Sequence, residues 1–342
     1  MQRLLNKISE LKIMLSEFSY KQTLYSGLDA INAFSIIEGG YLEHRLISLE
    51  SDTLCATHLS LGHIQIKSGK HNFPIIARGK VPADTVYIGF MTIGSESTRY
   101  NGIPVEAGRM RFYPENTEIF YQASGAAEWF AYSIPRAMLQ TAIDIYSAGR
   151  FKLSADQIMT FHIKPGPLNQ LKQEVTDILD IAKKINSVTL ADAKNMADIL
   201  SDALMKAYVK AICTPSNHIE DIKSVALNRF HGRLVMDSEQ LVLKNMQQNL
   251  KSGGIADFTG YSLRAMEMIF KNTVGMTPTH WFLNIRLNGA LRDLMYPKAN
   301  TTVSDVADKW GFQHLSRFSE QYRKVFRELP SQTLAKARSR QS

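Results

Sequence analysis

The sequence predicts an α+β protein in which an antiparallel β-sandwich or barrel comes first, a helical hairpin follows, and an all-α domain with two helix-turn-helix units ends the chain. Three observations predict this order. Short alternating runs fill residues 20–135, helical periodicity fills residues 136–213, and one helical pattern occurs twice after residue 229. A run of strands followed by a run of helices is typical of an α+β chain.

The strand-rich part of the segment 1–135 is a series of short runs separated by Gly, Asn and Pro. Alternating apolar and polar residues place one face of a strand against a core. Such runs occur at residues 44–50, 54–67, 86–94, 108–115 and 128–135. Their spacing, roughly 8–15 residues, favours an antiparallel sandwich or barrel.

The residues predict neither secretion nor a membrane span. The first residues include acids and no continuous apolar stretch, and no run of 18 or more apolar residues exists. The two cysteines, Cys55 and Cys213, lie far apart and suit a reducing compartment. We therefore expect a cytoplasmic protein. The first residues also predict an amphipathic helix that packs on the protein or contacts a second copy; a helix at a membrane surface is the alternative. Its apolar stripe is Leu4, Leu5, Ile8, Leu11 and Leu15.

Residues 136–213 are predicted to be helical. After a short amphipathic stretch, two longer ones repeat apolar residues at helical spacing in 168–185 and 191–212. The short turn between them predicts an antiparallel hairpin, whose stripes could pack on the strands or on a second copy. Residues 214–228 are predicted to be a linker, because Pro215 does not continue a helix.

The most informative stretch is 305–334, which predicts two short helices separated by a turn. The first places Val306, Ala307 and Trp310 on one face, and Gly311 suits the conformation that ends a helix. The second stops at Pro330 and carries an aromatic stripe at a spacing of four residues: Phe318, Tyr322 and Phe326. This is the helix-turn-helix plan, in which the second helix can lie in a DNA major groove.

The same pattern occurs 52 residues earlier, where Pro278 falls in register with Pro330. One helix connects the two copies, capped by Thr277 or Thr279 and ended by Pro297. We therefore predict units at about 252–275 and 303–327 within a domain of residues 229–342. Their predicted core is Ile255, Phe258, Met266, Phe270, Trp310, Phe318, Tyr322 and Phe326.

Two such units joined by one long helix resemble the AraC/XylS-type transcription regulators. The signature of their second unit stands here as Gly311, Phe312, Phe318, Tyr322, Phe326, Pro330 and Ser331. Their connecting-helix pattern stands as Arg286, Leu287 and Ala290. The resemblance covers about residues 229–340, and Arg327 departs from it, since most members have glycine there. The run 310–334 is most similar to a subgroup that includes regulators of ethanolamine utilisation.

The resemblance implies a cupin-like β-barrel that senses a ligand in residues 1–135 and dimer-forming helices in residues 136–213. It also implies an activator that contacts RNA polymerase. We therefore expect double-stranded DNA, RNA polymerase, a second copy of the chain and a possible small-molecule effector as partners, with no cofactor. Residues near the strands that could contact an effector are Met91, Arg99, Tyr100, Arg109, Arg111, Tyr113 and Trp129.

The cationic excess is confined to the repeated region. Residues 229–342 hold 17 Lys and Arg against 9 Asp and Glu, a net charge of +8, whereas the other 228 residues hold 23 of each. A local positive field over paired recognition helices is the electrostatic footprint of a surface that binds the phosphate backbone.

The predicted DNA contacts follow from position on the two recognition helices and from the resemblance. Arg264 can donate two bonds to guanine, and Glu267 can accept one from cytosine. The predicted base-reading residues are Arg264, Glu267, Met268, His314, Leu315, Ser316, Ser319 and Glu320. The predicted phosphate contacts are Ser262, Lys271, Arg317, Arg323 and Lys324. For Met268 and Leu315, simple packing is the alternative.

Nothing in the sequence favours catalysis or a metal site. The histidines of the strand region lack the His-x-His pair with a following Glu that metal-binding cupins show: His44, His58, His63 and His71. No nucleophile elbow, phosphate-binding glycine loop or CxxC motif occurs. We predict a sequence-specific activator without catalytic residues or metal. The alternatives are a ligand-independent or repressing regulator of the same family, or a cupin-type enzyme fused to a DNA-binding domain.

Overall fold

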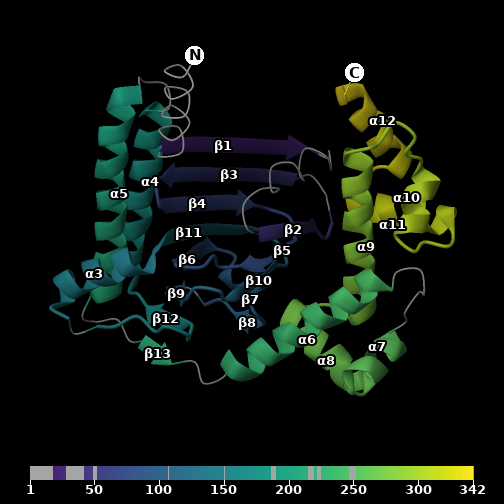
Figure 1. The fold of residues 1–342 in the computed structure, drawn as a ribbon, viewed down its shortest axis with the longest axis horizontal. Helices are drawn as coiled ribbons and strands as arrows, with labels where there is room; N and C mark the ends of the chain where they lie inside the picture. Colours follow the sequence, from purple (N-terminus) through teal and green to yellow (C-terminus); the bar gives the residue numbers. More distant parts are fainter. Residues whose placement is uncertain are drawn as a thin grey trace, which may run out of the picture.

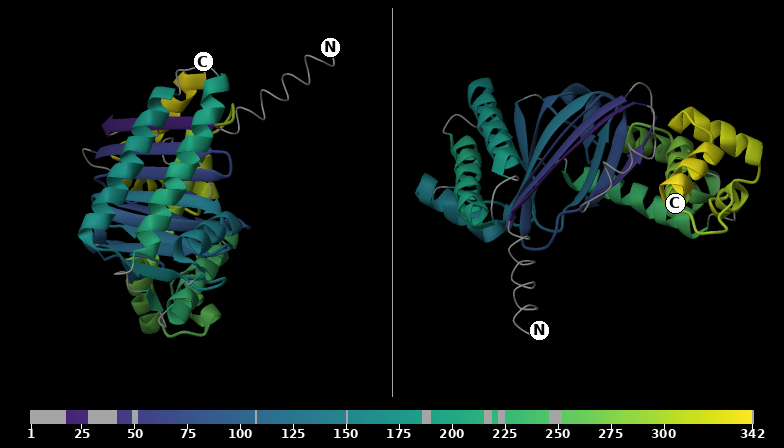
Figure 2. Two further views of the ribbon diagram at one scale, coloured as in Figure 1. Left: turned by 90° about the vertical axis from the view of Figure 1, so that its left-hand side faces the viewer. Right: turned by 90° about the horizontal axis from the view of Figure 1, so that it is seen from above.

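A computed structural model of the 342-residue chain shows two antiparallel sheets between a layer of helices and a helical C-terminal domain (Figures 1 and 2). It describes residues 18–27, 42–48, 52–106, 108–149, 151–185, 190–214, 219–221, 225–245 and 252–341. The amphipathic pattern predicted before residue 18 lies outside these residues. None of the described helices is long and apolar enough to cross a bilayer.

The larger sheet, sheet A, contains eight strands in the order β1-β3-β4-β11-β6-β9-β12-β13. These are β1 (Phe18–Gly27), β3 (Asp52–Leu61), β4 (Ile64–His71), β11 (Ala127–Pro135), β6 (Thr85–Ile93), β9 (Arg109–Tyr113), β12 (Met159–His162) and β13 (Ile219–Asp221). All neighbours pair antiparallel. The single alternating run 54–67 is thus two strands, β3 and β4, joined at Gly62, whose φ of 61° suits the turn.

The smaller sheet, sheet B, contains five strands in the order β2-β5-β10-β7-β8. These are β2 (Leu42–Leu46), β5 (Ile75–Lys80), β10 (Glu118–Ala123), β7 (Thr98–Tyr100) and β8 (Ile103–Pro104), and the short helix η1 (Ser95–Ser97) precedes β7. Tyr100 of sheet B meets Tyr113 of sheet A with ring centroids 5.8 Å apart, so the sheets face one another. The described strands form this sandwich and not the closed, cupin-like barrel that the resemblance implied.

The two faces of sheet A have different neighbours. On β11, Phe130 and Tyr132 belong to the core under the helices, whereas Ala131 lies in the core between the sheets. Tyr132 stacks on Tyr208 of the covering helices with ring centroids 4.2 Å apart. The central strands β6 and β11 of sheet A are therefore buried on both faces, which explains their many large apolar residues.

The helices α3 (Arg136–Ser147), α4 (Pro165–Ile185) and α5 (Leu190–Cys213) cover the outer face of sheet A (Figures 1 and 2). The predicted stripe of α4 is buried there, including Leu171 and Val175. Lys172 also bonds to Glu128 of β11 over 2.6 Å. The sequence allowed these apolar stripes to pack either on the strands or on a second copy of the chain. Within this chain they pack on sheet A.

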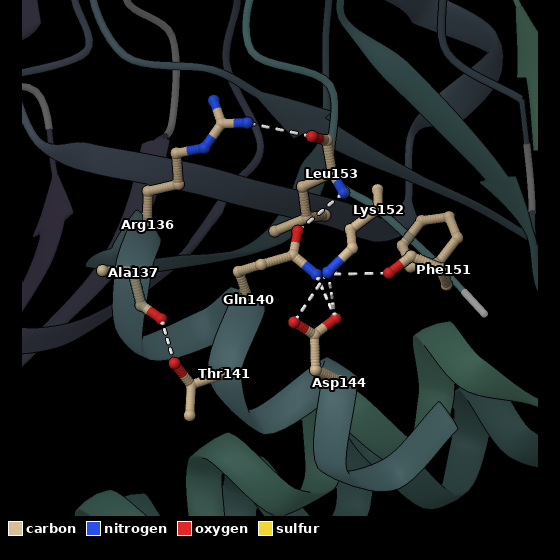
Figure 3. A network of polar contacts seen from close by, with 8 residues as sticks. All are labelled: Arg136, Ala137, Gln140, Thr141, Asp144, Phe151, Lys152 and Leu153. Carbon is tan, nitrogen blue, oxygen red and sulfur yellow. Dashed lines mark hydrogen bonds and ion pairs between the residues drawn. The ribbon is translucent and has the colours of Figure 1, made fainter. Parts of the chain in front are cut away.

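A polar network fixes α3 to the loop that leads to β12 (Figure 3). Gln140 donates to Asp144 over 2.8 Å and accepts from the amide of Leu153 over 2.8 Å, and Arg136 donates to the carbonyl of Leu153 over 2.9 Å. Lys152 pairs with Asp144, and both Lys152 and Gln140 hold the pKa of that carboxyl below its usual value. The loop between residues 151 and 153 is thus tied to successive turns of α3.

The C-terminal domain is all helical. It comprises α6 (Val225–Lys244), α7 (Ser252–Thr259), α8 (Leu263–Val274), α9 (Pro278–Met295), α10 (Val303–Lys309), α11 (Leu315–Phe326) and α12 (Pro330–Gln341). It lies on the side of the sandwich opposite α4 and α5, against sheet B (Figure 2). Within the stretch expected to be a linker, Ile219–Asp221 forms β13, and α6 begins at Val225.

Candidate nucleic-acid interface

The first helix-turn-helix unit consists of α7 and α8. The hydroxyl of Ser262 accepts the amide of Ala265 over 3.2 Å and so caps α8, which ends at Gly275 with a φ of 71°. Three of the residues predicted to form its core are fully buried: Ile255, Met266 and Phe270. The side chain of Phe258 lies outside the described part of the chain.

The second unit consists of α10 and α11. Thr302 and Asp305 form a reciprocal capping box at the start of α10, and Gly311 takes a φ of 73° in the turn that follows α10. The stripe Phe318, Tyr322 and Phe326 is fully buried, and successive rings meet edge to face with centroids 5.6 and 4.6 Å apart. This packing fixes α11 against the rest of the unit.

Both units are built on α9, whose first turn is capped by Thr277. Trp310, at the end of α10, lies against α9 where Gly289 has no side chain: a Cβ there would come within 2.0 Å of the indole. The indole nitrogen of Trp310 donates to Asp293 of α9 over 2.7 Å. Trp310 is therefore a half-buried residue that packs against the core of the second unit and joins this unit to the connecting helix.

A buried polar chain, which sequence reasoning missed, holds α12 to α11. Tyr322 bonds through its hydroxyl to Thr333 over 2.9 Å, and Thr333 donates to Glu328 over 2.6 Å. Lys336 also pairs with Glu328. Burial raises the pKa of Tyr322 well above its ordinary value, so the phenol stays neutral. The helix after Pro330 thus supports the recognition helix from behind.

Arg327 ends α11 in a left-handed conformation, with a φ of 59°. A side chain is strained there, whereas glycine is not. We expect Arg327→Gly to raise the free energy of unfolding by about 1 kcal/mol, which urea unfolding would measure. The matched control is Lys324→Gly, inside the same helix, which should lower it by about 1 kcal/mol. A loss of stability in Arg327→Gly would show that the contacts of the arginine outweigh its backbone strain.

The side chains predicted to read bases lie on the outer faces of the two recognition helices. On α8, Arg264, Glu267 and Met268 are exposed, and on α11 Ser319 alone among them is partly buried. Met268 is 60% exposed and Leu315 is 46% exposed, so neither is packed into the core of this chain. The remaining members are exposed: His314, Leu315, Ser316 and Glu320.

The predicted phosphate contacts surround the same two faces. The exposed members are Ser262, Lys271, Arg317, Arg323 and Lys324. On α8 a guanidinium and a carboxylate, Arg264 and Glu267, precede the cation Lys271. On α11 hydroxyl and carboxylate groups near the N-terminus are followed by the cations Arg323 and Lys324. Side chains of these types bond to base edges and phosphates, respectively.

Comparison with known proteins connects this geometry to one family. Residues 255–336 match a family model described as a helix-turn-helix domain. The XylDLEGF operon transcriptional activator of Pseudomonas putida is 34% identical over 96 residues, which cover 28% of this chain and 30% of that protein. The HTH-type transcriptional activator RhaS of Pectobacterium atrosepticum is 31% identical over 97 residues, which cover 28% of this chain and 34% of that protein.

A solved structure, a probable AraC family transcriptional regulator from Rhodopseudomonas palustris, is 30% identical over 31% of this chain and 97% of that chain, with a TM-score of 0.29. The matches thus span about a third of the length of the two curated relatives. The matched residues 255–336 contain the second unit and, apart from the first three residues of α7, the first unit. Residues 255–336 are therefore a helix-turn-helix domain similar to those of AraC/XylS-type transcription regulators.

Proposed function

We propose that the chain is a sequence-specific DNA-binding transcription regulator that activates its target genes. The observation that carries the proposal is the pair of exposed, polar recognition faces on α8 and α11, held by one connecting helix in the cationic part of the chain. A rigid connecting helix should place both in successive major grooves, about 10 base pairs apart. The two curated relatives are named transcriptional activators, which supports activation and not repression.

The rest of the proposal concerns the sandwich and its helices. We infer that the protein acts in the cytoplasm as a homodimer through α3 to α5, that it contacts RNA polymerase, and that the sandwich senses a small molecule. Met138, Ile145 and Ile199 support the dimer, since these apolar side chains are exposed on the helices. A ligand-independent or repressing regulator is the runner-up, and an enzyme fused to a DNA-binding domain is a weaker alternative.

The strand register supports an effector site between the sheets. Tyr100, Tyr113 and Trp129 pack in the core between the two sheets, so they would face an effector there. Arg99 of β7 lies opposite Gln122 of β10 in the strand register, so both side chains point to the outer face of sheet B. Arg99 therefore points away from the space between the sheets. Arg111 is buried and donates to the carbonyl of Pro104 over 2.7 Å. Aromatic and polar side chains together are the usual lining of a small-molecule site.

The proposed function is tested by selecting the full-length protein on a random duplex library at about 0.15 M salt, followed by sequencing. We expect enrichment of sites with two short elements one helical turn apart, repeated in direct or inverted order if the protein is a dimer. The absence of any motif, with binding that salt abolishes, would mean a purely electrostatic binder and would overturn the proposal.

Arg264→Ala tests the reading face of α8. Because a bidentate arginine discriminates one base pair, we expect a loss of about 1–3 kcal/mol in binding free energy and relaxed preference at one position of the selected site. Lys271→Ala, about two turns later on the same helix, is the control and should weaken binding to all sequences alike. Equal weakening across sequences by Arg264→Ala would instead make Arg264 a phosphate contact.

A further inference from the structure

A charge cluster centred on a fully buried carboxylate joins sheet B to the C-terminal domain. Glu239 of α6 is 0% exposed and accepts from both terminal nitrogens of Arg45 of β2, over 3.0 and 2.5 Å. Arg78 of β5 pairs with the same carboxylate over 2.5 Å. The guanidinium of Arg45 also lies over the ring of Trp281 of α9, 5.5 Å from its centroid. Breaking such a buried cluster is costly, because the remaining charges stay desolvated.

A second contact satisfies the backbone of an edge strand. The side chain of Asn288 accepts the amide of Leu46 over 2.9 Å and donates to its carbonyl over 2.9 Å, and Asn284 donates to the same carbonyl over 2.8 Å. Leu46 ends β2, which is an edge of sheet B. An edge strand leaves such groups unpaired unless another element covers them. The helix α9 therefore replaces a neighbouring strand at this point.

Apolar contacts complete the surface. Phe120 of β10 meets Trp281 with ring centroids 5.2 Å apart, and Ile76 of β5 belongs to the same core cluster as α8 and α9 residues. The end of α8 approaches so closely that a Cβ on Gly275 would come within 2.2 Å of Gln122. We call the outer face of sheet B the docking face; its members in this contact are Arg45, Ile76, Arg78, Phe120 and Gln122.

The strands of the docking face have their other face between the two sheets. Ala77 and Tyr121 are partners in the register of β5 and β10, and the ring centroid of Tyr121 lies 5.0 Å from that of Tyr100, which in turn meets Tyr113 of sheet A. Ala77 and Tyr121 therefore face the space between the sheets. Their neighbours Ile76 and Phe120 belong to the cluster shared with the C-terminal domain. Because side chains alternate along a strand, one peptide unit separates the space between the sheets from the DNA-binding domain.

Docking leaves the recognition faces open. Arg264, Glu267 and Met268 remain exposed while the far end of α8 contacts Gln122 and Gly102. The docked arrangement therefore does not cover the surfaces expected to meet DNA.

We propose that Arg45, Arg78 and Glu239 are positioning residues that hold the DNA-binding domain on the docking face in its DNA-competent arrangement. A change between the sheets then reaches the helix-turn-helix units through β5 and β10, and not through the linker before α6. The part of this proposal that concerns DNA rests on the proposed function, whereas the docking itself does not.

Hydrogen exchange of the full-length protein without DNA tests the docking. Glu239→Gln keeps the shape of the side chain and removes its charge, so we expect about tenfold faster exchange in peptides that contain Leu46 and α9, with β6 and β11 unchanged. Arg45→Met is the second, milder variant, since it leaves Glu239 paired with Arg78. Glu128→Gln is the matched control, because it breaks the ion pair with Lys172 on the opposite face of sheet A. Unchanged exchange at Leu46 in both docking variants would overturn the proposal.

The route of coupling is tested on the duplex selected by the wild-type protein. A flexible four-residue insertion between Lys223 and Ser224 should leave the affinity within about twofold, whereas Glu239→Gln should lower it at least about fivefold. The opposite pattern, a loss on insertion and none in Glu239→Gln, would assign the coupling to the linker and overturn the proposal. Higher affinity in Glu239→Gln would make docking inhibitory and overturn it as well. A protein that selects no duplex would fail as a regulator, and the exchange experiment would still decide whether the cluster docks the domain.

Discussion

Gly289→Val is expected to destabilise the C-terminal domain by about 3 kcal/mol and to weaken binding to DNA. The reason is geometric, because a Cβ at this position would lie 2.0 Å from the indole of Trp310. The ring cannot stay between α9 and α10, so its bond to Asp293 is lost along with the packing. Overpacking of this kind costs about 1–3 kcal/mol or somewhat more. Urea unfolding and affinity for the selected duplex would measure the two effects.

The double variant Gly289→Val with Trp310→Leu separates the clash from other causes. The smaller leucine leaves room for the valine, so the pair should be more stable than the Gly289→Val single variant, which is the non-additivity expected of touching residues. An additive result would mean that the valine acts through the helix backbone and not through Trp310.

Acidification is expected to destabilise the sandwich through His71. The ring is 4% exposed and bonds to the carbonyl of Phe73 over 2.8 Å and to the hydroxyl of Tyr121 over 3.3 Å. Burial lowers its pKa from 6.5 to about 4. Below pH 6.5 the imidazole is therefore protonated in the unfolded chain but stays neutral in the folded chain. The free energy of unfolding is highest above that pH and falls by about 1.4 kcal/mol per pH unit until about pH 4.

Unfolding free energies measured above and below pH 6.5 test this expectation, with His71→Gln beside the wild type. His71→Gln should have a lower free energy of unfolding than the wild type at neutral pH. On acidification, its free energy of unfolding should fall by less than that of the wild type. Part of the dependence should remain, because burial and Lys67 also lower the pKa of His58. His63→Gln, in the exposed turn between β3 and β4, is the control and should behave as the wild type does. An unchanged slope in His71→Gln would exclude His71 as the source.

The helix-turn-helix units could be predicted from the sequence because their determinants are local. Gly311 ends α10, and Phe318, Tyr322 and Phe326 recur within one helix of 12 residues. Spacing alone therefore assigns the buried face of α11 and, by exclusion, the face that carries Glu320. The repeat 52 residues earlier adds the same information for α8.

The strands of sheet B were harder to identify, for a physical reason. β10 is buried at every residue but the first, and β5 begins with three buried residues, because one face meets sheet A and the other meets the C-terminal domain. Alternation between apolar and polar residues disappears when both faces of a strand are covered. The runs Ile75–Lys80 and Glu118–Ala123 therefore carry no period-two signal.

The contact between the two parts of the chain has no sequence signal. Arg45 and Glu239 are 194 residues apart, and each reads as an ordinary surface charge in its own segment. Only the folded chain brings them together beside Trp281. The same holds for Asn288, whose place in α9 predicts a polar helix surface although it is 1% exposed.

The connecting helix α9 has a consequence for how this chain can vary in length. This helix contacts three parts of the molecule. Asn284 and Asn288 bond to β2, and Trp281 packs on the first unit and sheet B. The indole of Trp310 from the second unit lies against Gly289. One inserted residue turns everything beyond it by about 100° and advances it by about 1.5 Å. An insertion after Asn288 would thus rotate α10 and α11 away from the groove reached by α8. Related chains should tolerate added residues in their loops and almost none within this helix.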